Sequence, residues 1–304
     1  MILSFFPGKI LDPQVEGSLE LRMLLGACVK YNPQTGSLFL SQKSYAEKVV
    51  GRFDTPKWGT GAGLLGGHIV NEGADISKDE FDYRACVGSL NYLVAMTRPD
   101  LAWSVSQLSK FLSSPKESAV VAAARILRYV GKTPHLGIRY NPDAAQKMKK
   151  DVPMFGYCDS DFAGCPTSRK STTGCIVYFH GCPVWWKSSL QPVVTTSSAE
   201  AEYVALFTLV KELAHLSQVV EFLQIDQSPV IPVVYCDNGS TVAMAKSPIS
   251  TKRSRHIEVR WHYVREQLKS GKFVLEWAPT KLQRADALTK SRPGHILTGL
   301  LEQI

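Results

Sequence analysis

Hydrophobic and polar positions follow a different rhythm in the two halves of the chain. In the second half, three segments alternate as β-strands do and are joined by short links: MFGYCDSD, TGCIVYFHG and PVWWKSS. A helical period follows over residues 199–224, and two further strand-like segments, VIPVVYCDN and KFVLEWAP, alternate with helical stretches at STVAMAK, residues 255–269 and ADALTK. The pattern predicts the order β-β-β-α-β-α-β-α, which is typical of an α/β fold with a mixed five-stranded sheet and flanking helices.

The first half is mainly helical in pattern and opens with one predicted β-hairpin. Its strands, LLGACVKYNP and SLFLSQ, are joined by a turn at Gln34-Thr35-Gly36, and a short strand, LGIRYNP, comes last. Residues 55–78 are rich in glycine and lack periodicity, which indicates a loop. Helices are predicted at residues 43–53, 79–96, 100–112 and 116–130. We therefore expect two domains, at residues 1–150 and 151–304.

Acidic residues stand at the ends of two predicted strands of the second half. By alternation, Asp159 shares one face of its strand with Phe155, Tyr157 and Asp161. Asp237 ends the strand VVYCDN in the same manner. Ligand sites of open α/β sheets gather at the carboxyl ends of the strands, so both aspartates are candidates for a binding site.

A glutamate occupies a position in the long helix that helix structure alone does not explain. Ser197 and Glu200 have the spacing of a capping box, which gives Glu200 a structural role. Glu202 instead falls on the apolar stripe of the helix over residues 199–224. A buried acid is unfavourable by several kcal/mol unless a partner compensates it. Asp286 is placed similarly, among the apolar residues of ADALTK.

Each of these acids taken singly is also consistent with a turn or capping role. Four carboxylates at one edge of a sheet, however, cannot all ionise cheaply without a cation. Oxygen ligands without a histidine or cysteine cluster favour Mg²⁺, or else Mn²⁺, and two such ions about 4 Å apart can hold a reacting phosphodiester between them. The sequence therefore predicts two ions bound by Asp159, Glu202, Asp237 and Asp286.

The overall charge makes a polyanionic partner plausible, although many basic proteins have none. The formal net charge is +8, and the stretch from Lys246 to Lys272 is basic, with Trp261, His262 and Tyr263 interleaved. A solvated helix face is the alternative reading of this stretch. Beside a carboxylate cluster, a surface that follows phosphates is the better interpretation. The residues proposed for nucleic-acid binding are Lys252, Arg253, Arg255, Arg260 and Arg265.

The cysteines and the apolar segments bear on the compartment of the chain. Seven cysteines occur without any CxxC pair, which indicates reduced thiols of an intracellular protein, in the cytoplasm or the nucleus. The first ten residues, MILSFFPGKI, lack the basic region of a signal peptide, and no apolar stretch approaches the roughly 20 residues of a membrane span. We therefore expect no membrane partner.

Several blocks of the chain resemble the polyproteins of copia-type (Ty1/copia, pseudoviridae) retrotransposons. Those similar to the ribonuclease H domain of these elements include YCDSDFAGCPTSRKSTTGCIVYF, WWKSSLQPVVTTSSAEAEYVAL, VVYCDNGSTVAMAK and RADALTK. YRACVGSLNYLVAMTRPDLAWSVSQLSKF resembles the C-terminal part of their reverse transcriptase. The resemblance covers about residues 20–290, with the blocks in the family's order.

The resemblance implies a ribonuclease H-like fold preceded by a thumb-like or connection-like region. It implies Mg²⁺-dependent cleavage of the RNA strand of RNA–DNA hybrids, with an RNA–DNA hybrid as the partner and the rest of the polymerase, supplied in trans, as a second one. By position in the matching blocks, Asp159 would bridge two ions. Glu202 and Asp237 would hold one of them, and Asp286 the other. Asp161 belongs to the family's pattern but is assigned no metal.

The departures from the family limit the expected activities. No two aspartates are adjacent in this sequence, so we expect no DNA synthesis by this chain alone. The stretch PTKLQRAD has no histidine before Asp286, and Ser291-Arg292 follows ADALTK where the family usually has proline. The alternative function is that of a non-catalytic, nucleic-acid-binding remnant of a decayed retroelement. A transposase-like nuclease is disfavoured, because its glutamate would come after the second aspartate.

Overall fold

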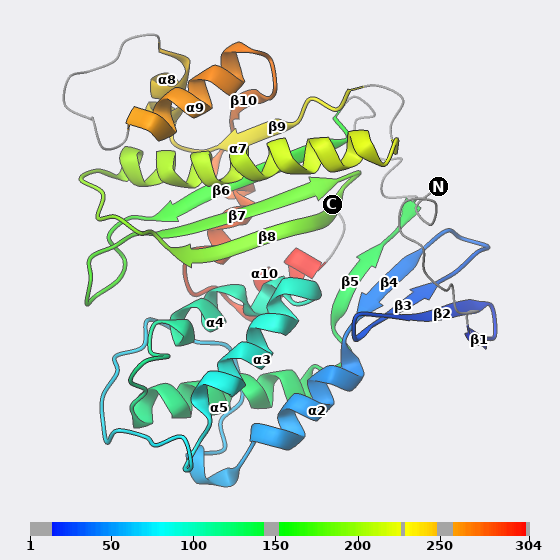
Figure 1. The fold of residues 1–304 in the computed structure, drawn as a ribbon, viewed down its shortest axis with the longest axis vertical. Helices are drawn as coiled ribbons and strands as arrows, with labels where there is room; N and C mark the ends of the chain where they lie inside the picture. The colour runs from blue at the N-terminus through cyan, green and yellow to red at the C-terminus, as the bar shows by residue number, and fades with distance from the viewer. Residues whose placement is uncertain (1–13, 143–151, 226–228, 248–257, 302–304) are drawn as a thin grey trace.

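The first of two β-sheets is formed by segments from the first half of the chain. The computed structural model describes residues 14–142, 152–225, 229–247 and 258–301. Neighbouring strands of the first sheet are all antiparallel and lie beside one another in chain order (Figure 1). These strands are β1 (Gln14–Glu16), β2 (Leu19–Leu24), β3 (Ala27–Tyr31), β4 (Leu38–Ser41) and β5 (Gly137–Tyr140).

This sheet contains one more hairpin than the sequence predicted. The single strand predicted for LLGACVKYNP was wrong at its start, because the chain turns at Leu25 and Gly26. Both residues have left-handed backbones, with φ of 49° and 75°, as a two-residue hairpin turn requires. The predicted hairpin through Gln34-Thr35-Gly36 is confirmed and joins β3 to β4.

Four helices pack around an apolar core below this sheet (Figure 1). They lie close to where the hydrophobic period predicted them, although three begin one to four residues later than predicted. Asp82 caps the second helix by accepting a hydrogen bond from the Ala85 N–H at 3.0 Å, and the short turn η2 (Pro99–Leu101) precedes the third. The helices are α2 (Lys43–Phe53), α3 (Tyr83–Met96), α4 (Ala102–Ser109) and α5 (Glu117–Lys132).

The second sheet has the order β10-β9-β6-β7-β8. The first three of its strands along the chain form an antiparallel meander, and the last two are added in parallel on the other side of β6. This topology confirms the mixed five-stranded, ribonuclease H-like sheet. The strands are β6 (Met154–Asp161), β7 (Thr172–Phe179), β8 (Cys182–Leu190), β9 (Val233–Cys236) and β10 (Val274–Trp277).

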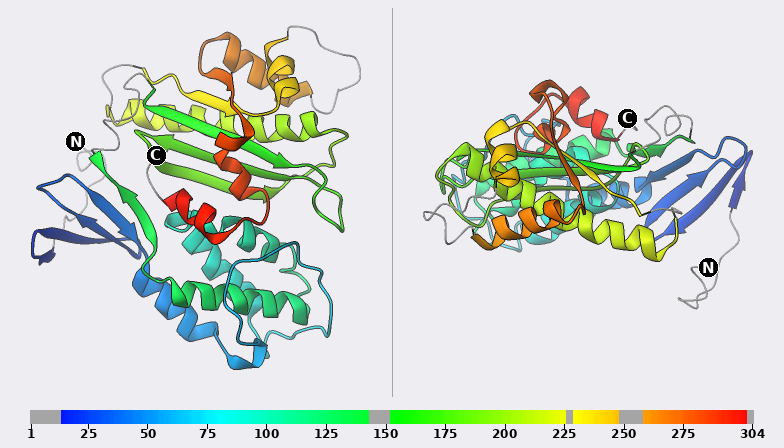
Figure 2. Two further views of the ribbon diagram at one scale, coloured as in Figure 1. Left: turned by 180° about the vertical axis from the view of Figure 1, so that it is seen from behind. Right: turned by 90° about the horizontal axis from the view of Figure 1, so that it is seen from above.

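Helices cover both faces of the second sheet. The long helix α7 (Ser198–Phe222) lies across one face. Beside it, α8 (Gly239–Lys246) and α9 (Glu258–Lys269) lie near the edge of the sheet that β9 and β10 form (Figure 1). The opposite face is crossed by the C-terminal segment (Figure 2), which contains η4 (Arg284–Leu288), α10 (Gly294–Thr298) and η5 (Gly299–Leu301). Within the described ranges, no helix combines the length and the hydropathy needed to cross a bilayer.

One apolar cluster joins the two halves of the molecule. Phe155 and Tyr178 of the second sheet share it with Ala102 of α4 and Leu297 of α10. The indole of Trp186 adds a hydrogen bond from β8 to the carbonyl of Val94 at 2.7 Å. The division into domains near residue 150 therefore stays a prediction, because the C-terminal segment packs against helices of the first half.

Candidate metal centre

The backbone brings two aspartates to one edge of the second sheet. β6 and β9 pair in parallel only as far as Tyr157 and Tyr235, and the ladder ends there. Asp159 comes two residues after Tyr157 on β6. Asp237 comes two residues after Tyr235, just beyond the end of β9. The face predicted for Asp159 is also confirmed, since Phe155 and Tyr157 pack in the cluster that contains η4 and Asp159 accepts a hydrogen bond from Thr289 at the end of η4.

Glu202 reaches the same edge from the beginning of α7. The N–H of Ser160 lies beyond the last residue pair of the β6–β9 ladder. It donates a hydrogen bond to Oε1 of Glu202 at 3.0 Å. This bond holds the glutamate against the end of β6, although the residue lies on the buried face of the helix and is only 6% exposed.

Three of the four predicted acids form one group. One carboxylate oxygen each from Asp159, Glu202 and Asp237 lies within 4.8 Å of the others. Asp159 and Glu202 are buried, whereas Asp237 is half-buried. A set of three carboxylates offers the hard oxygen ligands that Mg²⁺, Mn²⁺ or Ca²⁺ prefers. The group can therefore hold a divalent metal ion.

The electrostatics of this group favour a bound cation. Burial raises the pKa of Asp159 to about 6, and the neighbouring carboxylates of Asp286 and Asp237 act in the same direction. Burial raises the pKa of Glu202 to about 10, with a further contribution from Asp159. Among the described residues, Oε2 of Glu202 is buried without a hydrogen-bond partner. A cation would compensate both the uncompensated charge and the unpaired oxygen.

Two further residues hold Asp159 in place, and neither of them was predicted from the sequence. Thr289 donates a hydrogen bond from its hydroxyl to Oδ2 of Asp159 at 2.7 Å. Gln283 donates from its side-chain amide to the carbonyl of Cys158 at 2.8 Å. Both side chains are buried and come from the ends of η4, more than 120 residues later in the chain. Threonine in ADALTK and glutamine in KLQRAD carry no local pattern that would reveal these contacts.

Gly174 of β7 makes room for this turn. It lies directly opposite Asp159 in the β6–β7 register. A Cβ at this position would lie 2.6 Å from the carbonyl oxygen of Ala285 and 2.6 Å from Cγ2 of Thr289. The absence of a side chain therefore lets η4 pack on the sheet, close enough for Thr289 to reach Asp159.

Replacing Gly174 by Ala should displace η4 from the sheet. We expect the free energy of unfolding to fall by about 2 kcal/mol, as for other overpacked core positions. Urea denaturation measures this change. The control is Gly239→Ala at the start of α8, where an added Cβ would meet nothing within 4 Å. Equal stability of the Gly174 and Gly239 variants would contradict the close packing of η4.

Asp286, the fourth predicted acid, lies outside the three-carboxylate group. Its Oδ1 pairs with the ammonium of Lys290 at 2.6 Å, and its Oδ2 pairs with the guanidinium of Arg292. The side chain of Asp286 is 14% exposed. Asp286 remains near enough to Asp159 to raise the pKa of that carboxyl. The structure thus brings three of the four acids together and engages the fourth with two cations.

The two other acids singled out in the sequence have different roles. The Glu200 N–H donates to the Ser197 hydroxyl at 3.2 Å, as the capping box predicts. The Glu200 carboxylate, however, accepts from the Thr196 N–H at 2.7 Å and not from Ser197. Asp161 lies 3.8 Å from the imidazole of His68, which comes from the loop of the first half. Within the described part of the chain, Asp161 does not join the three-carboxylate group.

The predicted nucleic-acid-binding residues are only partly described. Lys252, Arg253 and Arg255 lie outside the described residues. Arg260 lies over the ring of Phe207 at 5.8 Å and lines a hollow beside α7. Arg265 donates two hydrogen bonds, at 3.3 and 2.9 Å, to the carbonyl of Met244 and so joins α9 to α8. For Arg265, these contacts indicate a structural role.

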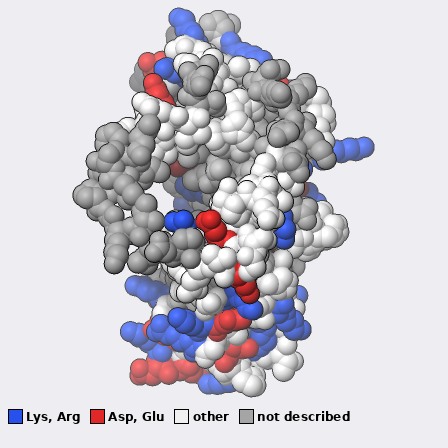
Figure 3. All heavy atoms as spheres, turned by 90° about the vertical axis from the view of Figure 1, so that its right-hand side faces the viewer, with Lys and Arg blue, Asp and Glu red and all other residues white. Residues whose placement is uncertain are grey.

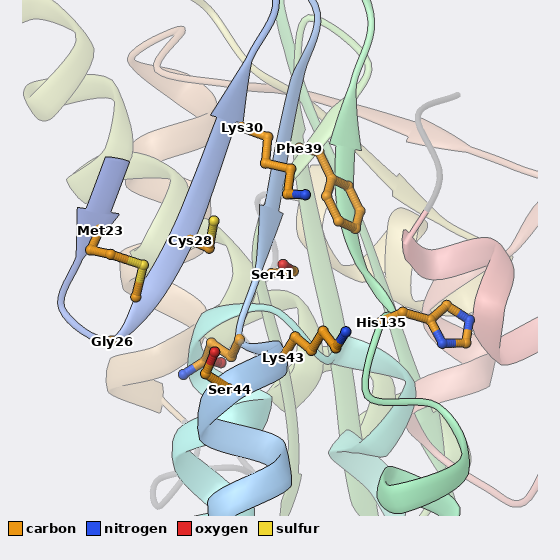
Figure 4. Close-up of a pocket in the computed structure, with 10 residues that line it drawn as sticks. Met23, Gly26, Cys28, Lys30, Phe39, Ser41, Lys43, Ser44 and His135 are labelled. Atoms are coloured by element: carbon orange, nitrogen blue, oxygen red, sulfur yellow. The ribbon is translucent and has the colours of Figure 1, made fainter. Parts of the chain in front are cut away.

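A basic hollow that the sequence did not predict lies between the first sheet and α2. It has a volume of about 300 Å³, and Figure 4 shows Lys30, Lys43 and His135 around it. Basic side chains also gather at the end of the molecule that contains α2, interspersed with acids (Figure 3). The exposed members on α2 and the turn after it are Lys43, Lys48, Arg52 and Lys57. The hollow forms because β3 and α2 lie close together in the fold, and no local sequence pattern reveals this proximity.

Comparison with known proteins identifies relatives along most of the chain. No protein-family model matches it. The chain is 33% identical to the Retrovirus-related Pol polyprotein from transposon TNT 1-94 of Nicotiana tabacum, over 90% of this chain and 20% of that protein. It is 37% identical to the Retrovirus-related Pol polyprotein from transposon RE1 of Arabidopsis thaliana, over 70% of this chain and 14% of that protein.

Solved structures that match part of the chain include LC11-RNase H1, isolated from compost. The TM-score is 0.35, with 17% identity over 45% of this chain and 92% of that one.

This chain spans a fifth or less of the length of the two Pol polyproteins. These two relatives, and a third that is 34% identical over 89% of this chain, are Pol polyproteins of transposons. The chain therefore belongs to the Pol polyprotein family of Ty1/copia-type transposons.

Proposed function

We propose that the second half of the chain is a Mg²⁺-dependent nuclease that cleaves the RNA strand of RNA–DNA hybrids. The observation that carries the proposal is the group formed by Asp159, Glu202 and Asp237, whose oxygens lie within 4.8 Å of one another. The group stands at the carboxyl ends of two strands in a ribonuclease H-like sheet. The blocks that resemble the ribonuclease H domain of Ty1/copia-type elements, together with membership of the Pol family, support the same function.

The chain's own residues have separable tasks in this reaction. Asp159, Glu202 and Asp237 would hold the ion, and the Ser160 N–H and the Thr289 hydroxyl fix two of these carboxylates. Bound Mg²⁺ supplies polarisation of the scissile phosphate and a more acidic water. Half-buried Asp237 is the most accessible of the three carboxylates, so the incoming strand would approach the ion from its side. The second ion of the sequence-based prediction would require Asp286, which is paired with two cations.

A strand-selective cleavage assay tests the proposal. The full chain is incubated with Mg²⁺ and a hybrid labelled on either the RNA or the DNA strand. We expect internal cuts in the RNA and an intact DNA strand, and we expect RNA–RNA and DNA–DNA duplexes to remain uncut. Cutting of the DNA strand at a similar rate would refute the proposed substrate class.

The alternative function is nucleic-acid binding without catalysis. It is favoured by one observation, the engagement of Asp286 by Lys290 and Arg292, which a fully assembled two-ion site would not show. A chain of this kind would bind hybrids yet leave them uncut in both Mg²⁺ and Mn²⁺. A grip on the hybrid by the thumb-like first half, a polymerase segment acting in trans, and a location in the cytoplasm or nucleus all stay predictions.

The basic hollow should contribute to hybrid binding through contact with a phosphate. Lys43 is exposed at its rim, and each phosphate contact of a lysine steepens the dependence of affinity on salt. We expect Lys43→Ala to lower the slope of log affinity against log salt by about one, measured by fluorescence anisotropy. The control is Lys78→Ala, an exposed lysine elsewhere in the first half. An unchanged slope in the Lys43 variant would exclude the hollow from the binding surface.

A further inference from the structure

The segment after η4 places two cations on a predicted metal ligand. Lys290 pairs with Oδ1 of Asp286 and Arg292 pairs with its Oδ2, so both carboxylate oxygens are engaged. A divalent ion that binds Asp286 must take one of these oxygens as a ligand. It would also meet the repulsion of a guanidinium at close range. Both cations therefore oppose the binding of an ion at Asp286, and the departure of either one favours it.

Arg292 is the more firmly held of the two cations. The Ser291 hydroxyl, immediately before it, donates a hydrogen bond to the carbonyl of Leu65 at 2.8 Å. After it, Pro293 leads into α10, whose Leu297 is buried against the first half. The side chain of Arg292 is 34% exposed, compared with 44% for Lys290. The two flanking anchors fix the backbone of Arg292, whereas Lys290 is the more exposed of the two and has a flexible stem.

The charge balance of the site agrees with a single ion in the absence of substrate. Asp159, Glu202, Asp237 and Asp286 contribute four negative formal charges, and Lys290 and Arg292 cancel two of them. One divalent ion neutralises the remainder. A second ion would leave an excess of two positive charges in a partly buried site, which is unfavourable unless a cation departs or an anion arrives.

We propose that Arg292 is a positioning residue that keeps Asp286 from binding metal, so that the substrate-free chain holds one divalent ion tightly and admits a second only when the guanidinium leaves. This inference rests on the metal site of the proposed function. It assigns a role to the Ser291-Arg292 pair, at which the sequence departs from the family pattern. It also connects the site to the first half of the chain, because Leu65 anchors the segment.

The number of bound ions tests the inference without any measurement of activity. Isothermal titration of the full chain with Mg²⁺ should give one tight ion per wild-type chain. Arg292→Gln should bind two ions, and its affinity for the second ion should exceed that of the wild type by at least about tenfold. Arg292→Lys retains the charge and should bind one. Lys281→Gln removes an equal charge from an exposed residue of η3 (Thr280–Leu282) and should also bind one.

Two further variants keep the test decisive. The double variant Asp286→Asn with Arg292→Gln should return to one ion, because the second ligand is lost. Ser291→Ala loosens the anchor without a change of charge and should increase the affinity for the second ion. This variant replaces Arg292→Gln in the test if Arg292→Gln does not melt cooperatively in EDTA. One ion in both Arg292→Gln and Ser291→Ala, or two tight ions in the wild type, would overturn the inference.

The outcomes also separate this inference from the proposed function. If Arg292→Gln gains an ion but the chain leaves hybrids uncut, the role of Arg292 stands and the nuclease proposal fails. If the wild type cleaves hybrids and Arg292→Gln gains no ion, the nuclease proposal stands and the role of Arg292 fails. If the wild type binds no Mg²⁺, both fail.

Discussion

Replacing Asp159 by Asn is expected to lower the rate of hybrid cleavage by at least about 10³-fold, because a metal ligand at the reacting centre is worth several kcal/mol. The carboxylate lies in the three-acid group and is fixed by the Thr289 hydroxyl. Asn has the same shape but lacks the charge that holds the ion. Hybrid binding should persist, since the substitution removes a negative charge near the phosphates. Single-turnover cleavage and fluorescence anisotropy separate the two effects.

The matched control is Asp161→Asn, on the same strand and the same face. Asp161 lies beside His68, and the structure does not place it with the other three carboxylates of the described chain. We expect the Asp161 variant to retain cleavage within about tenfold of the wild type, as expected for a residue that makes no contact with the ion. Equal losses in the two variants would show that the two aspartates act alike and would refute the assignment of Asp159.

Removal of the metal should make the stability of the chain depend strongly on pH. The pKa values of Asp159 and Glu202 are raised from 3.8 to about 6 and from 4.5 to about 10. Between the unfolded and folded values, the folded chain binds more protons than the unfolded chain. Stability from these protons is therefore complete below about pH 4 and is lost as the pH rises, through about 6 for Asp159 and toward about 10 for Glu202.

Glu202→Gln isolates this effect, because the amide has the same shape and no charge. In EDTA at pH 9, we expect the variant to exceed the wild type in free energy of unfolding by on the order of 2 kcal/mol, and by much less at pH 5. Urea denaturation at several pH values measures the difference. Glu266→Gln, an exposed residue of α9, should show no such trend. Mg²⁺ should stabilise the wild type and not the Glu202 variant.

A constant difference between the Glu202 variant and the wild type from pH 5 to pH 9 would contradict the buried, uncompensated carboxylate. A loss of stability in the variant at pH 9 would indicate that Glu202 has a partner in the folded chain. Either result would remove the electrostatic argument for a bound ion, although the geometry of the three-acid group would remain.

Local patterns were enough to predict most of the second half of the chain. Alternation along β6 predicted the face shared by Phe155, Tyr157 and Asp159, which the structure confirms. The apolar stripe of α7 predicted the burial of Glu202. These inferences succeed because period and burial are properties of single elements. The turn at Leu25-Gly26 was missed because both of its neighbours are strand-like.

Contacts between distant segments explain what the sequence could not predict. The hydrogen bond of Thr289 to Asp159 spans 130 residues, and the packing of η4 depends on Gly174 in another strand. The engagement of Asp286 by Arg292 likewise depends on how the C-terminal segment crosses the sheet. Sequence reasoning selected four acids, but it could not determine which three would meet.

The most direct measurement is the rate of hybrid cleavage by the full wild-type chain over a Mg²⁺ titration, from EDTA to saturation. We predict no cleavage in EDTA, and a rate that rises to a plateau as Mg²⁺ fills the site formed by Asp159, Glu202 and Asp237. Asp237→Asn should shift the rise to higher Mg²⁺, because one ligand is lost. An uncut hybrid at every Mg²⁺ concentration, or a rate that EDTA leaves unchanged, would contradict this prediction.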